Sequence, residues 1–410
     1  MSIKKILSGL ASSRDSREAL YKHFHRHPEL SLQEHATAAR IEEELRSGGI
    51  DEVLRVGATG VVAILRNGDG PVVAMRGDID ALPMAERSGK DYAAVGATQT
   101  DEASGEETPV AHTCGHDVHI VCLLDATKAL HAHRDAWSGT FVAVFQPGEE
   151  NAAGAKAMVA AGIVDKVPKP DVYLGQHVLG SLPGGAVGIR SGPLFSAAAS
   201  IEITLHGKGS HGSMPNLGVD PIVLGAAVVT RLQTIVAREV APRETAVVTV
   251  GSFHAGTKSN IIPDSAILQL NTRAFDRDVE RHLHEAIERI VRAECEAARC
   301  PRPPEFRYYD RYPLTSNHDA PTARVRAAFQ DWFGDGAVDM APVPASEDFP
   351  IIPDAFGCPY TYWGLGGFAD WKNAPGNHSP FFAPDLQPTL DRGVEAIVVA
   401  ASPWLVADRQ

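Results

Sequence analysis

Short apolar runs and stretches of helical period alternate along roughly the first 190 residues of the chain. The apolar runs have the length of β-strands, and turn residues bound them. Short apolar strands separated by helices predict an α/β layer built around a largely buried sheet. The expected strands cover 61–65, 72–75, 140–145 and 172–174, and the expected helices cover 18–27, 32–47, 119–133 and 152–161.

The pattern changes near residue 191, where apolar and polar positions begin to alternate. Ile201, Ile203 and Leu205 lie on one face of a half-buried strand. A helix, two strands, a long charged helix and a last strand follow. The resulting order β-α-β-β-α-β is typical of a small two-layer, ferredoxin-like module. These later elements are expected at 220–238, 245–252, 266–273, 276–298 and 305–309.

After residue 312 the first pattern resumes, with a helix expected at 320–333, a strand at 359–363 and a helix at 389–405. The simplest explanation is an α/β domain with a mixed, mostly parallel sheet flanked by helices, interrupted by a small α+β domain. We therefore expect the α/β domain to cover 1–189 and 309–410, and the inserted domain to cover 190–308.

The composition is that of an ordinary globular protein, with 44% hydrophobic and 22% charged residues. A net charge of -13 provides no basic footprint, so we expect no nucleic acid partner. No apolar run approaches the ~20 residues of a membrane helix, and polar residues interrupt the short apolar start, so we expect a cytoplasmic protein without a membrane partner. Five cysteines, an odd number, form no disulfide framework, which leaves Cys114 free to bind a metal or to react.

The densest group of chemically active residues is His112-Thr113-Cys114-Gly115-His116-Asp117-Val118-His119, just before the expected helix 119–133. It holds five potential ligands in eight residues. A thiolate and imidazoles on a short loop suit a borderline-soft ion such as Zn²⁺. Two alternatives are a helix start capped by Asp117 with exposed histidines, and a nucleophilic Cys114 activated by a histidine. Neither explains why so many ligand types gather here, so a metal site is favoured.

Further candidates follow three strands that we expect in the sheet. Asp78 and Asp80 come after the strand 72–75, Glu149 and Glu150 after 140–145, and His177 after 172–174. Each alone could be a turn or core residue. Because open α/β sheets gather ligands at the carboxyl ends of their strands, the three groups together predict one site. A hydrolytic metal site needs one carboxylate on the metal and another that takes a proton from water, and Glu149-Glu150 offers both.

His378 lies in a loop rich in Gly, Asn and Pro, where a histidine has no packing role. Adding it gives more ligands than the three that a single catalytic zinc usually takes from the protein. A pair of divalent ions sharing a ligand suits the number better. The candidate ligands are Cys114, His116, Glu150, His177 and His378, with Asp78 and Glu149 as orienting or proton-transfer groups.

The inserted module offers three more polar candidates. His211 lies in a Gly-rich turn and could donate to a developing oxyanion. Asn260 and Arg273 could bind a substrate carboxylate, the arginine in bidentate fashion. Ordinary turn residues and a surface arginine explain the same three positions equally well.

Several motifs together carry a family resemblance. They are HRHPELS from His25, MRGDIDALPM from Met75, HTCGHDVH from His112, FQPGEE from Phe145, GQHV from Gly175, KGSHGSMP from Lys208, SNIIPD from Ser259, SEDFP from Ser346 and the His378 loop. With these motifs the chain resembles the metallo-aminoacylase and hippurate hydrolase group of two-metal amidohydrolases, which includes the plant indole-acetyl-amino-acid hydrolases. The motifs span most of the chain in the family's order, and HTCGHD followed by PGEE is the most specific part.

The resemblance implies a catalytic domain that holds two divalent ions and an inserted lid that often forms dimers. It implies Cys114 as the bridging ligand, Glu149 as the general base and Asp78 as a residue that orients a ligand. His211 would reach the site of a partner subunit, and Asn260 and Arg273 would hold the substrate carboxylate. His116, Glu150, His177 and His378 would complete the ligand set.

We therefore expect an enzyme that cleaves the amide bond of N-acyl amino acids, hippurate-like or acetylated, with a metal-activated water. The ions could be Zn, Mn, Co or Ni, because mixed Cys, His and Glu ligands accept all four. The expected partners are the small-molecule substrate and a second copy of the chain, in a homodimer or higher homo-oligomer. The alternatives are a dipeptidase, an N-carbamoyl-amino-acid hydrolase on the same metal site, and a catalytically inactive metal-binding relative.

Overall fold

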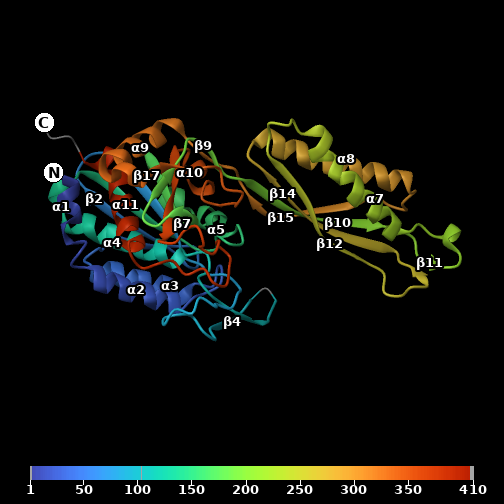
Figure 1. Cartoon of the computed structure of the whole chain (residues 1–410), viewed down its shortest axis with the longest axis horizontal. Helices are drawn as coiled ribbons and strands as arrows, with labels where there is room; N and C mark the ends of the chain where they lie inside the picture. Colours follow the sequence, from blue (N-terminus) through green and yellow to red (C-terminus); the bar gives the residue numbers. More distant parts are fainter. Residues whose placement is uncertain (1, 103, 407–410) are drawn as a thin grey trace. The chain divides into compact units, whose positions relative to one another are not determined.

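The computed structural model describes residues 2–102 and 104–406, which form two compact units (Figure 1). Unit 1 contains the described residues up to Gly192, Ser316–Ala341, and those from Asp348 onward. Unit 2 contains Pro193–Thr315 and the short segment Pro342–Glu347. The chain thus leaves unit 1 and returns to it, so the residues of unit 1 come from distant parts of the sequence.

Unit 2 includes one segment that the sequence analysis did not assign to it. The residues 342–347 follow a long stretch of unit 1, yet the Val343 N–H donates to the Leu194 carbonyl and the Ser196 N–H donates to the Ala345 carbonyl, each at 2.8 Å. Such backbone pairing between distant segments leaves no mark in the hydrophobic pattern.

Unit 1 is built on an eight-stranded sheet with the order β1-β2-β6-β3-β7-β18-β8-β17. The central strands β6, β3, β7 and β18 run parallel, and antiparallel pairs join β1, β2 and β8 to them. The predicted mixed, mostly parallel sheet flanked by helices is confirmed. Its strands are β1 Val53–Val56, β2 Gly60–Asn67, β3 Val72–Asp78, β6 Gly139–Gln146, β7 Val172–Pro183, β8 Val187–Ile189, β17 Ala337–Asp339 and β18 Tyr360–Phe368, and a separate hairpin pairs β4 Thr98–Thr100 with β5 Glu107–Pro109.

Helices cover the sheet because its central strands are apolar on both faces. Every residue of β6 and β18 is buried. Helices α2, α4, α9 and α11 contribute to one continuous core with alternate residues of these strands. The α-helices of unit 1 are α1 Ser2–Ile6, α2 Arg14–Arg26, α3 His35–Ser47, α4 His116–Ala132, α5 Gly154–Ala160, α6 Ile163–Lys166, α9 Asp319–Phe333, α10 Ile351–Phe356 and α11 Thr389–Leu405, with 3₁₀ turns η1 Leu7–Gly9, η2 Arg134–Ala136 and η5 Gly334–Gly336.

Among the element ends that differ from the sequence predictions, three affect a candidate residue. Helix α4 begins at His116 and not at residue 119, because Gly115 turns the chain with φ 84° directly before it. Strand β3 extends to Asp78, and β7 continues past His177 to Pro183. Parallel pairing with β18 carries β7 beyond the apolar run on which the prediction relied.

Unit 2 has a four-stranded antiparallel sheet with the order β12-β14-β10-β15, on which α7 and α8 lie. This is the ferredoxin-like arrangement that the order of elements predicted. The elements of unit 2 are β10 Ala197–His206, β11 Ser210–His211, η3 Pro215–Leu217, α7 Pro221–Thr234, the π-helical turn η4 Ile235–Glu239, β12 Ala246–Ala255, β13 Ile261–Ile262, β14 Ser265–Ala274, α8 Arg277–Ala297 and β15 Glu305–Tyr312. Strands β9 Gly192–Phe195 and β16 Thr315–Asn317 lie where the chain passes between the units.

One helical segment of unit 2, Pro221–Glu239, has the length and apolar composition of a membrane-spanning helix, which the sequence analysis did not expect of any segment. In the structure its residues Leu224, Val228 and Leu232 are buried in the core of the unit. Asp220 caps its first turn by accepting from the backbone N–H of Ile222 at 2.8 Å. The inner face of this helix therefore packs in the core of unit 2, and only its outer apolar face is left exposed.

Candidate metal centre

The candidate residues of unit 1 converge at one edge of the sheet. Strands β6, β3 and β7 are neighbours and run parallel, so their carboxyl ends meet. Asp78 ends β3, the Glu149-Glu150 pair follows β6, and His177 lies in β7. The first turn of α4 enters the same edge with His116.

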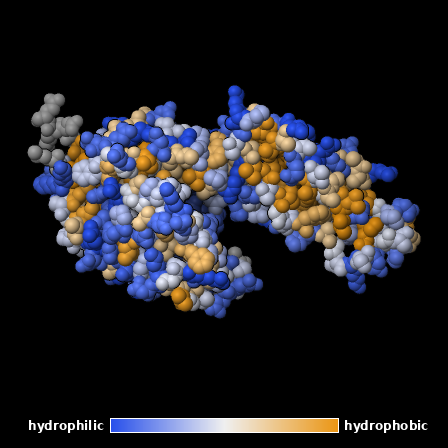
Figure 2. Space-filling view, viewed as in Figure 1, coloured by the Kyte–Doolittle hydropathy of each residue, from blue (hydrophilic) through white to orange (hydrophobic). Residues whose placement is uncertain are grey.

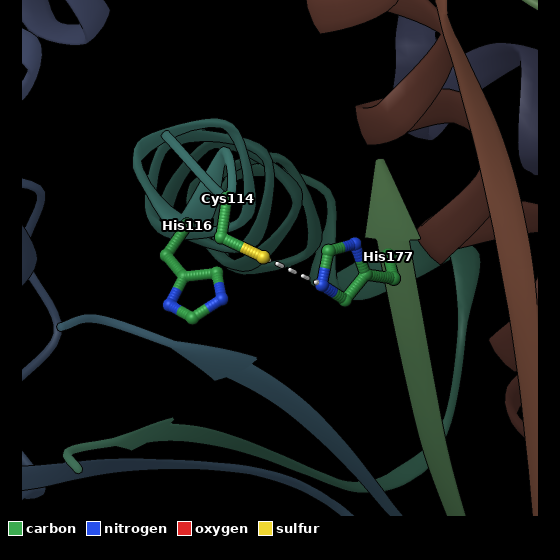
Figure 3. A group of neighbouring side chains, drawn as sticks. All are labelled: Cys114, His116 and His177. Carbon is green, nitrogen blue, oxygen red and sulfur yellow. Dashed lines mark hydrogen bonds between the residues drawn. The ribbon is translucent and has the colours of Figure 1, made fainter. Parts of the chain in front are cut away.

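The loop before α4 approaches β7 closely because it contains a glycine. Gly115 has φ 84°, and a Cβ atom there would lie 2.4 Å from Cγ1 of Val178. Only glycine fits such a close, left-handed turn. Cys114 is thereby brought to His177, with 3.5 Å between Sγ and Nε2 (Figure 3).

The potential ligand atoms form two groups that share Cys114. One group is Cys114, His116 and His177, and the other is Cys114, Glu150 and His378; within each, the ligand atoms lie within 4.8 Å of one another. The first group is buried, whereas the His378 side chain is 53% exposed, so the second group faces solvent. Two donor sets joined by one thiol match the needs of a pair of divalent ions.

The buried group shows a direct sign that it suits a metal ion. Nε2 of His116 is buried and makes no hydrogen bond, although it lies 3.7 Å from Oε1 of Glu150. An unpaired imidazole nitrogen in a protein interior costs free energy unless a ligand takes its lone pair. The donor set of thiol, imidazole and carboxylate is also one that borderline-soft divalent ions accept.

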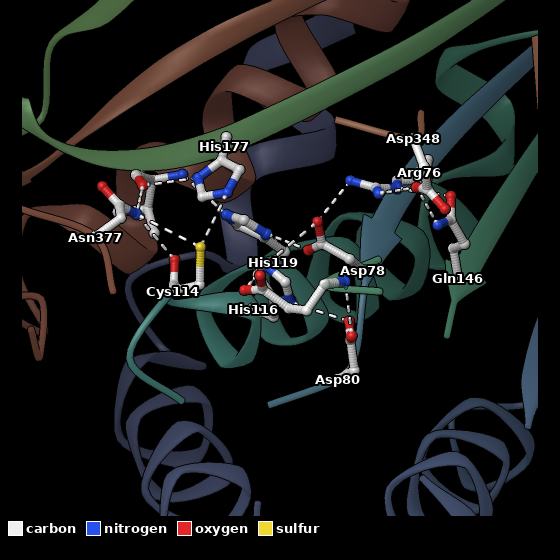
Figure 4. Close-up of polar contacts among 12 residues, drawn as sticks. Arg76, Asp78, Asp80, Cys114, His116, His119, Gln146, His177, Asp348 and Asn377 are labelled. Atoms are coloured by element: carbon white, nitrogen blue, oxygen red, sulfur yellow. Dashed lines mark hydrogen bonds and ion pairs between the residues drawn. The ribbon is translucent and has the colours of Figure 1, made fainter. Parts of the chain in front are cut away.

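Asp80 holds His116 in the orientation that leaves Nε2 directed at the ligand cluster. Its Oδ1 lies 3.2 Å from Nδ1 of His116 (Figure 4). Its Oδ2 accepts from Ser31 Oγ at 2.7 Å and from the Glu150 N–H at 3.0 Å. Burial raises the pKa of Asp80, but the hydrogen bonds from His116 and Ser31 outweigh it and lower the pKa. Asp80 was expected at this sheet edge together with Asp78 but was given no role of its own; its position two residues after Asp78 was the available signal.

Asp78 does not face the cluster as a free carboxylate. Oδ2 accepts from Arg76 Nη1 at 2.6 Å and Oδ1 is hydrogen-bonded to His119 Nδ1. Burial would raise the pKa of Asp78, but Arg76 and His116 hold it well below its ordinary value. Arg76 is itself completely buried and also contacts Gln146 and Asp348 (Figure 4). The Asp78 carboxylate is therefore held in place by a buried cation.

The Glu149-Glu150 turn is positioned by a residue that the sequence analysis missed. Glu34 is buried, and its Oε1 accepts from the Gly148 N–H at 2.8 Å while its Oε2 accepts from Thr59 at 2.7 Å. Glu149 is only 5% exposed, and its carboxylate lies within 4.8 Å of the ligand atoms of His116 and Glu150. The carboxylate predicted as a base is therefore adjacent to the candidate ligands. No feature of the sequence near Glu34 pointed to this contact.

His211, Asn260 and Arg273 belong to unit 2, where two of them are neighbours. Strand β11 pairs with β13, and the Gly212 N–H donates to the Asn260 carbonyl at 2.8 Å. Arg273 lies near the opposite end of β14, where Nη1 donates to the Pro344 carbonyl at 2.7 Å and to Ser346 Oγ at 3.1 Å. A strand rises about 3.4 Å per residue, so β14 keeps Arg273 far from Asn260 within one chain.

Comparison with known proteins agrees with this site. The sequence pattern of the peptidase family M20/M25/M40 matches residues 74–401, which include every candidate ligand. The chain belongs to this family. The resemblance noted from the motifs is thereby confirmed, and so is the prediction of a di-metal hydrolase that acts on amides.

Relatives of this M20 chain include two curated enzymes and one solved structure. An N-acyl-L-amino acid amidohydrolase of Geobacillus stearothermophilus is 39% identical over 300 residues, covering 73% of this chain and 77% of the relative. Thermostable carboxypeptidase 2 of Saccharolobus solfataricus is 33% identical over 392 residues, covering 93% and 94%. A dinuclear metal binding peptidase of family M20 from Bacillus subtilis has a TM-score of 0.78 and 26% identity, covering 95% of this chain and 98% of that one. These relationships support two divalent metal ions in the M20 site.

Proposed function

We propose that this M20 protein hydrolyses the amide bond of N-acyl amino acids with a pair of divalent metal ions. The observation that carries the proposal is the presence of two ligand groups that share Cys114, with the Glu149 carboxylate beside them. A relative that is an N-acyl-L-amino acid amidohydrolase supports the substrate class.

Each of the two ligand groups would hold one metal ion. Cys114 would bind both ions, His116 and His177 would complete one site, and Glu150 and His378 would complete the other. When bound, the ions polarise the substrate carbonyl and make the attacking water more acidic. The ligand set accepts Zn, Mn, Co or Ni.

Glu149 would move the proton that the reaction requires. It takes a proton from the water that attacks the carbonyl carbon, and it returns this proton to the nitrogen as the C–N bond breaks. Its burial beside His116 and Glu150 supports this role, because a buried carboxylate close to the reacting water needs no large movement. Asp78 and Asp80 would keep the histidines in place.

His211 would donate a hydrogen bond to the oxyanion. The Ser213 N–H lies 3.2 Å from Nδ1 of His211 and can only donate to it, so the imidazole proton is on Nε2. The His211 side chain is exposed, and the Nε2–H is available to a ligand. Neutral imidazole with an outward N–H is suited to stabilising a developing negative charge.

Asn260 and Arg273 would hold the substrate carboxylate. Their separation within one chain implies that two chains form each site. Because β14 lies between them, both reach one substrate only if they come from different chains. We therefore propose a homodimer in which one chain supplies Arg273 to a site and the other chain supplies His211 with Asn260 to the same site. The family resemblance of the lid histidine supports the same arrangement.

The surface of unit 2 supports a self-associating face. Strand β12 is an edge strand, and its Val247 and Phe253 are exposed. On the outer face of α7, Ile222 and Val223 are 42% and 67% exposed. Figure 2 shows hydrophobic residues gathered on this unit. An unpaired strand edge beside an apolar helix face is suited to pairing with a second copy.

The location that we propose is the cytoplasm. None of the five cysteines, all within the described residues, forms a disulfide. Free thiols of this kind are typical of a reducing compartment.

A substrate screen tests the proposed activity. Chelated protein is reloaded separately with Zn, Mn, Co or Ni and assayed on hippurate, acetyl-amino acids, N-carbamoyl amino acids and dipeptides. We expect release of free amino acid from an acylated substrate with at least one metal. Peptides are the second candidate, because the relative from Saccharolobus is a carboxypeptidase. Absence of metal-dependent hydrolysis of any amide would favour the inactive metal-binding alternative.

Two variants separate the base from the ligands. Glu149→Ala should keep both metal ions and lose several orders of magnitude in turnover, since general base catalysis contributes about 10²–10⁴-fold and the base here also supplies the leaving-group proton. Glu150→Ala should lose one metal equivalent as well. Normal hydrolysis by Glu149→Ala would reject the assignment of the base.

A further inference from the structure

His119 lies among the ligands, yet its two nitrogens are already used. The Val178 N–H donates to Nε2 at 2.8 Å, so this nitrogen carries the lone pair and not a proton. The proton is therefore on Nδ1, which donates to Asp78. The His119 side chain is 1% exposed. A histidine held on both nitrogens cannot bind a metal ion, although it lies close enough to Asp78 and His116 to be grouped with them.

The backbone of Val178, which His119 holds from one side, orients a candidate ligand. Nδ1 of His177 donates to the Val178 carbonyl at 2.8 Å, which leaves Nε2 directed at Cys114. The position of this carbonyl therefore decides the direction in which the His177 imidazole points. Fixing the protein side of a ligating histidine in this way is a common means of orienting the ring.

Asn377 holds the same backbone from the other side. Its amide nitrogen donates to the Val178 carbonyl at 3.0 Å and to the Cys114 carbonyl at 3.1 Å (Figure 4). Both acceptors are carbonyl oxygens, so the NH₂ group and not the amide oxygen must face them. The same nitrogen lies 3.8 Å from Cys114 Sγ, within reach of the shared thiol.

Asn377 also precedes a ligand in the chain. His378 has φ 65°, an unusual value for a residue that is not glycine, and its N–H donates to the Thr113 carbonyl at 2.9 Å. The amide of Asn377 thus joins three ligand-bearing segments, namely the Cys114 loop, the middle of β7 with His177, and the His378 loop.

We propose that His119 and Asn377 are positioning residues that clamp the Val178 backbone and so set the geometry of the metal pair. His119 acts on His177 alone and so on the buried site. Asn377 acts on His177, Cys114 and His378 and so on both sites. The inference rests on the proposed function, because it takes the two ligand groups as the metal sites.

Cobalt titration of the chelated full-length protein tests the clamp without measuring activity. Binding of Co²⁺ is followed by calorimetry and by the absorption of thiolate-bound and tetrahedral cobalt. We expect His119→Leu to weaken one of two equivalents by about 10–100-fold, the usual effect of losing such an outer contact, and to leave the other unchanged. His119→Gln should restore most of the affinity, because its amide oxygen can accept from the Val178 N–H.

Asn377→Leu provides an independent test. Because Asn377 is a half-buried loop residue, we expect this variant to fold. It should weaken both equivalents and shift the thiolate absorption. Asn373→Leu is the matched control, because this asparagine lies in the same loop and donates only to Asp370. If His119→Leu does not fold, Asn377→Leu and His119→Gln decide the question.

The outcomes separate this inference from the proposed function. If wild-type protein binds two equivalents and Asn377→Leu binds both with unchanged affinity and spectrum, the clamp is wrong while the metal centre stands. If His119→Leu and His119→Gln weaken binding equally, His119 does not act through its acceptor nitrogen and its role in the clamp is rejected. Wild-type protein that binds no cobalt would overturn the proposed function itself.

Discussion

Asp80 and His116 are joined by a hydrogen bond of 3.2 Å between Oδ1 and Nδ1, and the other carboxylate oxygen holds the backbone of Glu150 at 3.0 Å. One buried carboxylate thus contacts a proposed ligand of each metal ion. The two ligands come from α4 and from the turn after β6, so Asp80 couples the positions of both ions.

Asp80→Asn should therefore weaken metal binding without removing a ligand. The amide can still accept from His116, but its NH₂ group would face the Glu150 N–H, which can only donate, and the Ser31 hydroxyl would have to rotate to accept from it. We expect a loss of affinity of about 10–100-fold, measured by competition with a chromogenic chelator. Ser31→Ala, which removes only one of the three partners, should change the affinity much less. Unchanged affinity in Asp80→Asn would show that Asp80 does not orient the ligands.

A second buried group predicts a dependence of stability on pH. His25 places Nδ1 2.6 Å from Asp117 and Nε2 3.0 Å from Glu86. Burial alone would lower the pKa of His25, but the hydrogen bonds that its ring donates to both carboxylates outweigh burial and raise the pKa to about 9. Since the folded pKa is the higher one, the stabilisation is complete below the ordinary value of 6.5 and is lost as the pH rises through about 9.

Urea unfolding of the metal-free protein at several pH values measures this effect. The free energy of unfolding should fall by about 3 kcal/mol more in wild type than in His25→Gln as the pH rises across this window, since each pKa unit corresponds to about 1.4 kcal/mol. His23→Gln on the same helix should keep this loss of stability at high pH, because burial lowers the pKa of His23 instead of raising it. Parallel profiles for wild type and His25→Gln would contradict the charged state of His25.

We expect Arg76, which lies next to the candidate metal centre, to be essential for the folding stability of the protein. Its side chain is fully buried between Asp78 and Asp348, which are also fully buried. Arg76→Met would leave two carboxylates without their cation, and removing one partner of a buried ion pair costs about 3–5 kcal/mol. Arg66→Met on β2 of the same sheet removes an exposed pair with Glu52 and should cost less than about 1 kcal/mol. The melting temperatures of the two variants are compared by thermal unfolding. Equal values for Arg76→Met and Arg66→Met would contradict the larger cost expected for Arg76.

The sequence predicted the parts of the fold that the hydrophobic pattern determines. The short apolar runs of β3, β6 and β7 identify a buried parallel sheet, and the residues that follow these runs, Asp78, Glu150 and His177, meet at one edge. The contacts that orient these residues were not predictable. Glu34, Asp80 and Asn377 each hold a backbone N–H or carbonyl far away in the chain, and such contacts depend on tertiary packing that one sequence does not record.

Arg273 in unit 2 is a second example of a contact that the sequence alone does not determine. Its residue type suggested an anion-binding role, but only the length of β14 shows that Asn260 lies too far away to share a ligand with it within one chain. Both residues were expected to bind one carboxylate, because the sequence carries no measure of their separation. The proposed binding of one substrate carboxylate by both residues therefore depends on the number of chains in the active assembly.

Heterodimers test whether His211 serves the partner's site. Chains carrying Glu149→Ala and His211→Ala, each inactive as a homodimer, are expressed together with different tags and purified as the mixed dimer. If His211 acts across the dimer, the site with an intact Glu149 receives an intact His211, and the mixed dimer should have about half of the wild-type activity. If His211 acts within its own chain, both sites of this dimer are defective. The control reverses the outcome: a wild-type chain paired with one carrying both substitutions should be inactive in the first case and half active in the second. Activity in the control together with an inactive mixed dimer would therefore reject the exchange of His211 between subunits.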